Sequence, residues 1–427
     1  MDSVRPVDLT RRALPRRMIA TVAAALAAVT AAATLPLLPA NAADGTATPA
    51  GTDARGTRLV VQGHGYGHGH GMSQYGAEGA ARTGRSARQI LRQYYPHTSR
   101  DKRGGRLRVL ITGDTSPDVV VKPAKRLRVR DMADGKTWRL PTRKPNARKW
   151  RVTPVSGHAR RSAVQYRNRS GWHRWNLPGG RTVLKGDGQF RAKGSLRLVR
   201  PGGGVTAYRG SLRSVSPNRR SRTRDTINVV SPDQYVRGVL PSEMPASWHR
   251  AALRAQAVAA RTYAVWSRRA ADGRHWHVCD STSCQVYGGV DAEYPRTNAA
   301  VRTTARRILT FRGRPAFSQY SSSSGGWTAA GGKRYLPAKA DRWDGWRGNP
   351  HHRWRQSVSR RALHRAYPSL GRLRSARVTD RDGHGRWGGR AERVVLRGSR
   401  STVRVSGDDL RWAIGLRSTY FRLGRRG

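Results

Sequence analysis

Small and apolar residues repeat at helical spacing between residues 247 and 269, which predicts one long helix in the middle of the chain. Upstream of it, Ser231 is a favourable N-cap and Pro232 suits the first helical position, so a shorter helix is expected to run to about residue 239. Residues 86–95 also carry an apolar face at helical spacing and predict another helix.

Elsewhere, short apolar runs are separated by Gly, Pro and Asp turn signals, which is typical of strands. The runs considered as strands are residues 58–62, 107–111, 119–121, 127–130, 195–199 and 226–230. A hairpin is expected where Ile308–Phe311 pairs with Ala316–Tyr320, and residues 373–407 are again strand-like before a closing helix at 407–416. Because helices and strands occupy separate stretches, the chain is expected to adopt an α+β fold, with a β-rich module packed with a helical core.

The first 42 residues have the composition of a secretory signal peptide. Five arginines surround the start of an apolar, alanine-rich stretch at Met18–Leu38, and residues 40–42 (Ala-Asn-Ala) offer a cleavage site. We therefore expect cleavage and export rather than an uncleaved anchor. Residues 43–57 are small and polar, which predicts a flexible linker.

The formal charge of +58 over 427 residues favours polyanionic partners. Nucleic acid is the general candidate for so basic a chain, but export removes most of the case for it and leaves anionic polymers of the cell envelope. The aromatic residues Trp150, Tyr166, Trp172 and Trp175 alternate with arginines. They fit either a surface that stacks on sugars or bases, or a cover for the sheet, and we expect the second.

One carboxylate has an unusual setting. Glu243 stands between Pro241 and Pro245 and directly before Met244, in an expected turn between the two central helices. Apolar surroundings favour the neutral acid and raise a carboxyl pKa, which makes Glu243 a candidate proton donor. A glutamate at a helix end also serves as a capping or dipole device. The residues alone leave both interpretations open.

Glycine occupies alternate positions from Gly63 to Gly71, with His64, His68 and His70 among the residues between. Such a run passes close to a ligand because no Cβ blocks the approach. The histidines fit a metal site, the lining of a glycan cleft, or a glycine-rich turn with incidental imidazoles. No carboxylate or cysteine lies near them in the sequence, which disfavours the metal, and His70 is given no role.

Five motifs together resemble one family. They read PSEMP, ALRAQAVAARTYA, CQVYGG, SSSSGGWT and, from Gly63 to Ala77, GHGYGHGHGMSQYGA. The chain is similar in these motifs, in order, to the stage II sporulation protein D / LytB family of bacterial cell-wall proteins over most of residues 58–427.

The resemblance implies a lytic transglycosylase in which Glu243 is the catalytic acid. Its substrate would be the bond between N-acetylmuramic acid and N-acetylglucosamine, and its product a 1,6-anhydro sugar. The candidate contacts to the glycan offer amide, hydroxyl or backbone groups, and they are His68, Gln74, Tyr75, Gln285, Tyr287, Ser323, Gly325 and Gly326. Because the acid must begin neutral, Arg237, Arg250 and Arg261 are expected to point away from it. Tyr263 also matches the family and fits either a core contact or a substrate contact.

In many members of this family the glycine–histidine motif lies near the C-terminus, whereas here it precedes the core. We interpret the order as a circular permutation, which requires adjacent termini. It predicts that the strand at 58–62 lies beside a strand near 419–423, and that His68 and Gln74 approach Glu243.

Cys279 and Cys284 are the two cysteines of the chain. Some family members bind zinc here with a histidine directly before the second cysteine, a position that is Ser283 in this chain. His275 or His277 would have to substitute. A disulfide suits an exported protein, so we expect a disulfide and no cofactor, with zinc as the alternative.

The expected organisation is a signal peptide (1–42), a linker (43–57), an N-terminal segment that completes the core (58–105), a β-rich module (106–230) and a catalytic core (231–427). The expected function is a secreted transglycosylase acting on peptidoglycan glycan strands. The alternative is a noncatalytic wall-binding protein that enhances an amidase. Anionic wall polymers and a cell-wall amidase are further candidate partners.

Overall fold

The computed structural model of the protein describes residues 59–141, 146–218, 221, 223–271 and 273–424. The chain divides into two units between Arg55 and Gly56, and every described residue belongs to the second unit. The expected signal peptide and linker therefore lie outside the described residues. In the part of the chain that is described, no helix has the length and apolar character needed to cross a membrane.

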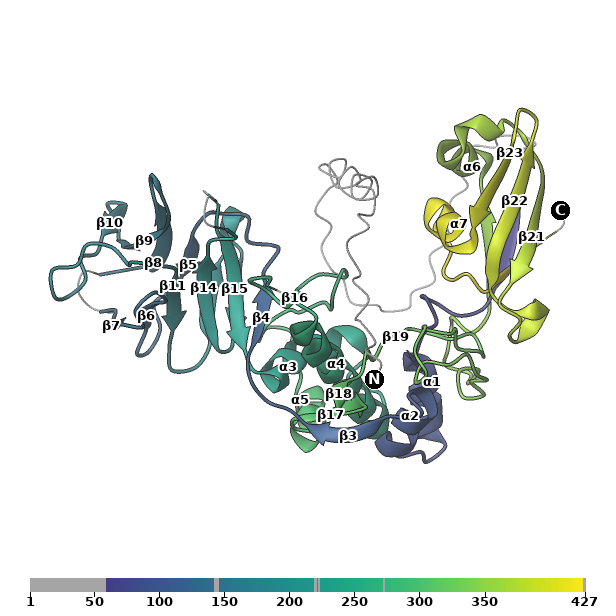
Figure 1. Ribbon diagram of the computed structural model, residues 1–427, viewed down its shortest axis with the longest axis horizontal. Helices are drawn as coiled ribbons and strands as arrows, with labels where there is room; N and C mark the ends of the chain where they lie inside the picture. The colour runs from purple at the N-terminus through teal and green to yellow at the C-terminus, as the bar shows by residue number, and fades with distance from the viewer. Residues whose placement is uncertain (1–58, 142–145, 219–220, 222, 272, 425–427) are drawn as a thin grey trace, which may run out of the picture. The chain divides into compact units, whose positions relative to one another are not determined.

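Two sheets contain the strands described between residues 106 and 230 (Figure 1). Their strands are β4 (Leu107–Leu110), β5 (Val119–Val121), β6 (Arg128–Asp131), β7 (Thr137–Arg139), β8 (Lys149–Val155), β9 (His158–Arg167), β10 (Trp172–Arg174), β11 (Gly188–Arg191), β12 (Leu196–Val199), β13 (Val205–Tyr208), β14 (Ser211–Val215), β15 (Asp225–Val230) and β16 (Val278–Cys279). One sheet has the order β16-β4-β15-β14-β11-β6-β7 and the other β10-β9-β8-β5-β12-β13. Strand β16 pairs in parallel with β4 and so joins the β-rich region to the later part of the chain.

The hairpin of β8 and β9 was not predicted from the sequence. Trp150 on β8 is fully buried and packs against Tyr166 on β9 and against Trp175. The guanidinium of Arg151 lies over the ring of Trp172. These aromatic rings cover the sheet, which confirms the packing interpretation of this basic, aromatic stretch.

A group of helices forms the centre of the larger hydrophobic core. Its helices and the short strands beside them are α1 (Gln74–Arg82), α2 (Ala87–Tyr94), α3 (Pro232–Glu243), α4 (Arg250–Arg269), α5 (Pro295–Thr303), β3 (Ser99–Lys102), β17 (Arg307–Phe311) and β18 (Arg314–Pro315). Helix α4 contacts all four of the other helices and β17. Its buried alanines, among them Ala257 and Ala260, allow this close packing because their side chains are small. The helix begins at Arg250 rather than near residue 247 because His249 is its N-cap.

The N-terminal described strand, β1 (Leu59–Gly63), lies between β20 (Trp354–Val358) and β24 (Phe421–Leu423). It pairs antiparallel with both, and Gly63 stands opposite Phe421. The predicted pairing between the first and last strands is therefore confirmed. The circular permutation that suggested it stays a prediction.

A second hydrophobic cluster lies around a sheet of three antiparallel strands near the C-terminus (Figure 1). Its elements are α6 (Arg360–Ala366), β21 (Leu373–Arg381), β22 (Ala391–Gly398), β23 (Thr402–Ser406) and α7 (Gly407–Ile414), with 3₁₀ turns at Pro368–Leu370 and Arg386–Gly388; a further 3₁₀ turn, Pro201–Gly203, belongs to the β-rich region. Leu363 of α6 and Leu410 of α7 pack with Val394 and Leu396 of β22. The two helices thus cover one face of this sheet.

The expected hairpin between Ile308–Phe311 and Ala316–Tyr320 is wrong beyond its first pairs. Strand β17 pairs with β18 for two residues, after which Ser318 N bonds to Ala316 O (3.0 Å) and Gln319 N to Phe317 O (3.0 Å). These tight turns lead the chain away from β17. Tyr320 and Ser321 instead form β19, which pairs in parallel with β2 (Met72–Ser73).

Candidate active site

Helix α3 carries the central carboxylate at its C-terminal end. The helix starts with a capping box, in which the backbone N–H of Gln234 donates to Ser231 Oγ and the backbone N–H of Ser231 donates to Gln234 Oε1. It ends at Glu243. It therefore extends past the expected end near residue 239, and Glu243 closes a helix rather than standing in a turn. The next residue, Met244, is extended and buried, which fixes the direction in which the chain leaves the helix.

Two side chains from distant parts of the chain meet at the Glu243 carboxyl group. Gln74 Nε2, at the start of α1, donates a hydrogen bond to Oε2 (3.1 Å). The hydroxyl of Tyr320, on β19, donates one to Oε1 (2.9 Å). The predicted approach of Gln74 to Glu243 is thus confirmed. Tyr320 was not predicted, although its place directly before the four serines of the SSSSGG motif was a usable signal.

Burial raises the pKa of Glu243 above its ordinary value, and the hydrogen bonds from Tyr320 and Gln74 offset part of that rise. Among the described residues, no arginine forms an ion pair with this carboxylate. Arg261, which was expected to point away, bonds Asp233 through Nε (2.6 Å) and is fully buried. Although the chain carries a charge of +58, the carboxyl group at the end of α3 thus has no guanidinium ion-pair partner among the described residues.

A cleft of about 380 Å³ opens beside Glu243. Its lining comes from the glycine-rich ribbon, α3, α4, the loop after β16, and β19 with the segment before it. The lining residues are His68, Ser242, Glu243, Tyr263, Thr282, Ser283, Cys284, Gln285, Val286, Phe317, Gln319 and Tyr320. Among these described lining residues, Glu243 is the only one with a carboxyl group. The volume lies in the range of about 300–1,000 Å³ that is typical of small-molecule sites, so the cleft accommodates one or two sugar rings rather than an ion.

The glycine-rich ribbon places His68 in this cleft. Gly69 and Gly71 both have positive φ angles, of 79° and 67°. A Cβ on Gly71 would lie 2.1 Å from the carbonyl oxygen of Gln319, and one on Gly69 would lie 2.2 Å from the guanidinium of Arg390. Glycine is thus required at both positions by backbone conformation and by space.

His68 is held as a neutral imidazole. Burial, together with the neighbouring groups His70 and Arg390, lowers its pKa to about 4. Its Nδ1 accepts a hydrogen bond from the backbone N–H of His70 (2.9 Å). The neutral ring therefore carries its proton on Nε2. A neutral ring adds no charge next to Glu243.

His64, the first histidine of the ribbon, is bound to the backbone. His64 is buried, and its Nδ1 donates to the carbonyl oxygen of His352 (2.9 Å). Within the described ranges of the chain, no group of three or more His, Cys, Asp or Glu is placed to hold a metal ion.

The structure joins Cys279 and Cys284 in a disulfide. Neither sulfur is then a thiolate, which is the form that binds zinc. The histidines that might have substituted are engaged elsewhere, because His275 bonds Asp225 and His277 accepts from the backbone N–H of Arg108. The bridge closes the loop whose residues 282–286 line the cleft, so it constrains one wall of the candidate site.

Gln285 lies in the cleft and is nearly fully buried. Its Nε2 donates to the hydroxyl of Tyr320 (2.7 Å), and its Oε1 has no hydrogen-bond partner. Gln285, Tyr320 and Glu243 thus form a row of hydrogen bonds in which each donor points towards the carboxylate. The Oε1 of Gln285 is a buried acceptor without a hydrogen-bond partner among the described residues.

Several other candidate contacts lie away from the lining of the cleft. Tyr287 is buried, donates its hydroxyl proton to Asn228 (2.9 Å) and packs against Tyr235. Tyr75 packs against Trp248, with ring centroids 4.9 Å apart. For both residues the structure shows packing roles, and their predicted contacts with glycan are not part of the observed cleft.

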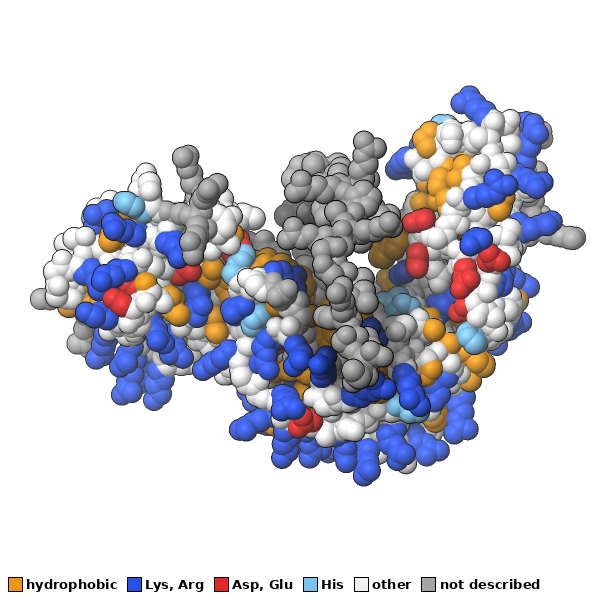
Figure 2. Space-filling model, in the orientation of Figure 1, with side chains coloured by type: hydrophobic (Ala, Val, Ile, Leu, Met, Phe, Trp, Pro, Cys, Tyr) orange, Lys and Arg blue, Asp and Glu red, His pale blue; other side chains and the backbone are white. Residues whose placement is uncertain are grey.

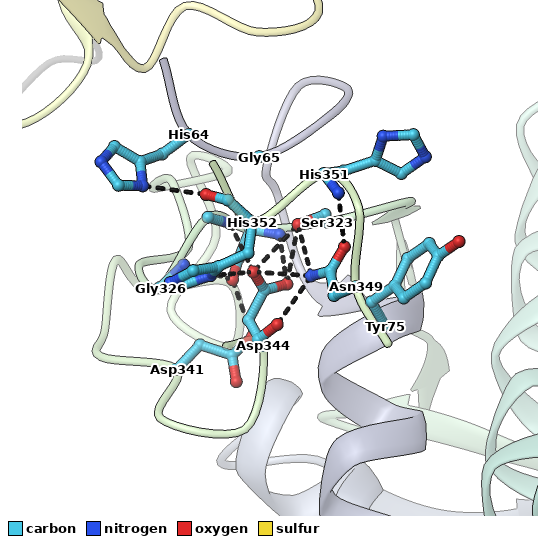
Figure 3. Close-up of polar contacts among 12 residues, drawn as sticks. His64, Gly65, Tyr75, Ser323, Gly326, Asp341, Asp344, Asn349, His351 and His352 are labelled. Carbon is cyan, nitrogen blue, oxygen red and sulfur yellow. Dashed lines mark hydrogen bonds and ion pairs between the residues drawn. The ribbon is translucent and has the colours of Figure 1, made fainter. Parts of the chain in front are cut away.

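The serine–glycine loop is likewise occupied by protein contacts (Figure 3). Ser323 is fully buried and donates to both oxygens of Asp344 (3.0 and 2.9 Å). The N–H of Gly325 also bonds Asp344 (3.0 Å). Gly326 has a φ of 101°, which favours glycine, and its N–H bonds Ser324 Oγ. These residues shape the loop behind β19 instead of lining the cleft.

Asp344 is the acceptor at the centre of that loop and was missed in the sequence. Besides Ser323 and Gly325 it accepts bonds from Ser73 Oγ (2.7 Å), Asn349 Nδ2 (3.1 Å) and His352 Nδ1 (2.9 Å). Although burial opposes ionisation, these donors, His352 first, hold the pKa of Asp344 below its ordinary value. Its neighbour Asp341 is buried with it, and burial together with the charge of Asp344 raises the pKa of Asp341 to about 7.

With the fold and the cleft described, comparison with known proteins places the central part of the chain. Residues 220–311 match the family model described as "Stage II sporulation protein". The chain is 39% identical over 134 residues to the amidase enhancer of Bacillus subtilis, which covers 30% of this chain and 17% of that protein. It is 33% identical over 111 residues to the stage II sporulation protein D of the same organism, which covers 22% of this chain and 32% of that protein.

The residues matched by the family model include α3, Glu243 and α4. This region of the chain is similar to the stage II sporulation protein family. The chain spans less than a third of the length of either curated relative, 17% of one and 32% of the other.

Proposed function

We propose that the protein is a peptidoglycan lytic transglycosylase that acts outside the cell on MurNAc–GlcNAc glycan strands, with Glu243 as its catalytic acid. The observation that carries the proposal is a half-buried carboxyl group of raised pKa at the edge of a cleft lined by neutral donors and acceptors, without an arginine ion-pair partner among the described residues. The similarity of this region to the stage II sporulation protein family supports a role at the cell wall.

Glu243 would first give its proton to the glycosidic oxygen that leaves with N-acetylglucosamine. The carboxylate so formed would then accept the proton of the muramic acid C6 hydroxyl, while that oxygen attacks C1. A C1–O bond breaks, a new C1–O6 bond forms, and Glu243 ends protonated, as it began. The product is a 1,6-anhydro ring, and water is neither consumed nor released.

This reaction explains how one carboxylate suffices. Glycosidases that use water or a covalent intermediate employ a pair of carboxylates about 5–10 Å apart. In the described lining of this cleft, Glu243 has no second carboxylate beside it. A nucleophile tethered within the substrate replaces the second group, because its attack is intramolecular.

Tyr320 and Gln74 would stabilise the carboxylate in the short interval when it is charged. Both donate to Glu243, to different oxygens. Each carboxyl oxygen has two lone pairs, so the acidic proton still has a free position that faces the cleft. Donors that are already in place where charge develops lower the barrier without further reorganisation.

The test is incubation of the full chain with purified glycan strands, both with and without stem peptides, followed by mass analysis of the ends. We expect anhydro ends, which are lighter than hydrolysed ends by one water. Hydrolysed ends, or intact strands under both conditions, would contradict the proposal.

A second candidate function rests on the similarity to a protein named amidase enhancer. In this alternative the cleft binds glycan without cleaving it and promotes the action of an amidase. The two are separated by adding the protein to an amidase digest of cell walls. An enhancer accelerates peptide release while no anhydro ends appear.

Tyr320→Phe tests the hydrogen bond to the acid. The change removes a donor that favours the charged carboxylate, so the pKa of Glu243 rises and the alkaline limb of the pH–rate profile moves to higher pH. The maximal rate falls by roughly tenfold to a hundredfold, because a hydrogen bond to a charged group contributes about 1.5–3 kcal/mol.

Tyr287→Phe is the matched control, since the Tyr287 hydroxyl bonds Asn228 rather than Glu243. The alkaline limb of the pH–rate profile of Tyr287→Phe should coincide with that of the unchanged protein. An unmoved limb in Tyr320→Phe would show that Glu243 does not set this part of the profile.

A further inference from the structure

The C-terminal sheet carries a groove that the proposed reaction does not use. It has a volume of about 570 Å³ and lies where α6, the start of β21 and the turn between β22 and β23 come together. Its lining consists of Arg360, Arg361, Leu363, His364, Gly371, Arg372, Leu373, Ser399 and Arg400. None of these residues lines the cleft at Glu243.

The charge of this groove is of one sign. Arg360 and Arg361 come from α6, and Arg372 and Arg400 come from the two segments opposite; all four are exposed. Among the described residues, none of the four guanidinium groups takes part in a salt bridge, and no carboxylate lines the groove. Four arginines that share a concavity repel one another, and an anion between them would relieve that repulsion.

Backbone contacts hold the arginine-bearing segments together. The backbone N–H of Arg372 donates to Ser399 Oγ (2.9 Å), and that of Ser399 donates to the Arg372 carbonyl (2.8 Å). The N–H of Arg400 bonds the Leu370 carbonyl (3.3 Å). The backbone positions of Arg372 and Arg400 are therefore set before any ligand binds, so that only their side chains have to be ordered on binding.

The remaining lining indicates which polyanion fits. The planar guanidinium group of arginine can donate two parallel N–H bonds to two oxygens of one phosphate. The apolar side chains in the described lining of the groove are Leu363 and Leu373, and its one ring is the imidazole of His364. This lining has no Phe, Tyr or Trp, the large rings on which single-stranded nucleic acids stack their successive bases. Figure 2 shows further Lys and Arg side chains around the end of the C-terminal sheet that carries α6, so a longer anionic chain meets positive charge beyond the groove.

We infer that this groove binds a linear phosphodiester polymer without bases, such as a polyol phosphate chain, through Arg360, Arg361, Arg372 and Arg400. The site is separate from the cleft at Glu243, and the inference does not depend on the proposed cleavage. Its effect would be to hold the protein on a surface that carries such polymers.

The experiment measures binding of the full chain to a fluorescent poly(glycerol phosphate) oligomer at several salt concentrations. Replacing Arg360, Arg361, Arg372 and Arg400 together by Gln is expected to weaken binding by about tenfold or more and to make the salt dependence shallower. The matched control replaces four exposed arginines of the β-rich region, Arg139, Arg160, Arg169 and Arg174, by Gln. This control loses the same charge and should weaken binding by less than about threefold.

Equal losses in the two variants would show that general charge attraction holds the polymer, and an unchanged groove variant would exclude the groove; either result overturns the inference. An oligothymidylate with the same number of phosphates serves as competitor. If it binds the groove as tightly as the polyol phosphate, with the same loss in the groove variant, the stated ligand class is wrong. Thermal unfolding of each variant verifies the fold, and Arg372→Gln with Arg400→Gln replaces the fourfold variant should that one unfold.

Discussion

Glu243→Gln is expected to abolish the formation of anhydro ends, lowering the rate by about a thousandfold, while the protein stays folded. General acid–base catalysis contributes about 10²–10⁴-fold, and in the proposed mechanism the same carboxyl group serves in both steps. A glutamine side chain keeps the size of the glutamate, and its carbonyl oxygen still accepts from either Gln74 or Tyr320. It cannot give a proton to the leaving oxygen.

The matched control is Glu392→Gln, the same change at an exposed carboxylate on β22. It should leave the rate of cleavage and the binding of glycan unchanged. Glu243→Gln should still bind strands, so a pull-down with insoluble peptidoglycan separates loss of chemistry from loss of binding. Anhydro ends produced by Glu243→Gln at the normal rate would remove this residue from the mechanism.

The parts of the fold that could be predicted are those specified locally. Ser231 and Pro232 mark the start of α3, and alanine spacing marks the body of α4, because caps and periodicity act over a few residues. The strand Val119–Val121 was recognised for the same reason. The pairing of β1 with β24 was a different kind of success, since it came from the order of the family motifs rather than from any local pattern.

The parts that could not be predicted depend on contacts between distant segments. β19 pairs with β2 across 248 positions of sequence, from Tyr320 to Met72, and no local signal records that partner. Tyr320 reaches Glu243 because of this pairing. The SSSSGG motif marks the neighbourhood of Tyr320 in the sequence, but its contact with Glu243 could not be predicted, because that contact depends on this distant pairing.

Asp344 shows a signal that the sequence did contain. The chain has 25 acidic residues and 83 lysines and arginines. Because acidic residues are few, each carboxylate that lies in a basic stretch is a candidate for a specific contact. Asp341 and Asp344 stand in such a stretch, between tryptophans and arginines. The burial of Asp344 could not be predicted, because it depends on contacts with Ser73 and Asn349, which the fold brings to it.

Asp344 also connects the loop behind β19 to the candidate acid. Ser73 Oγ donates to Asp344 (2.7 Å) and accepts from the N–H of Gly76 (2.9 Å), so it is the N-cap of α1 and an anchor at once. The next residue, Gln74, donates to Glu243. Asp344 therefore acts as a positioning residue: it fixes the start of α1, and α1 fixes a donor at the carboxyl group.

Asp344→Ala is expected to lower the free energy of unfolding by about 3–5 kcal/mol, because it leaves several buried donors without an acceptor. The buried groups that lose their partner include Ser323 Oγ and the backbone N–H groups of Ser324 and Gly325. Denaturant unfolding measures the loss, and amide hydrogen exchange at Ser324 and Gly325 should rise by more than exchange in the β-rich region.

Asp380→Ala provides the matched control for this loss. Asp380 pairs with Arg393 through side chains that are 50% and 77% exposed, so its removal should cost less than about 1 kcal/mol. Asp344→Asn separates shape from hydrogen bonding, because it keeps the volume of the side chain but turns one acceptor oxygen into a donor. Its loss in the free energy of unfolding should be closer to that of Asp344→Ala than to that of Asp380→Ala. If Asp344→Ala were as stable as Asp380→Ala, with unchanged exchange at Ser324, the loop would not depend on this carboxylate, and the alignment of Gln74 with Glu243 would need another anchor.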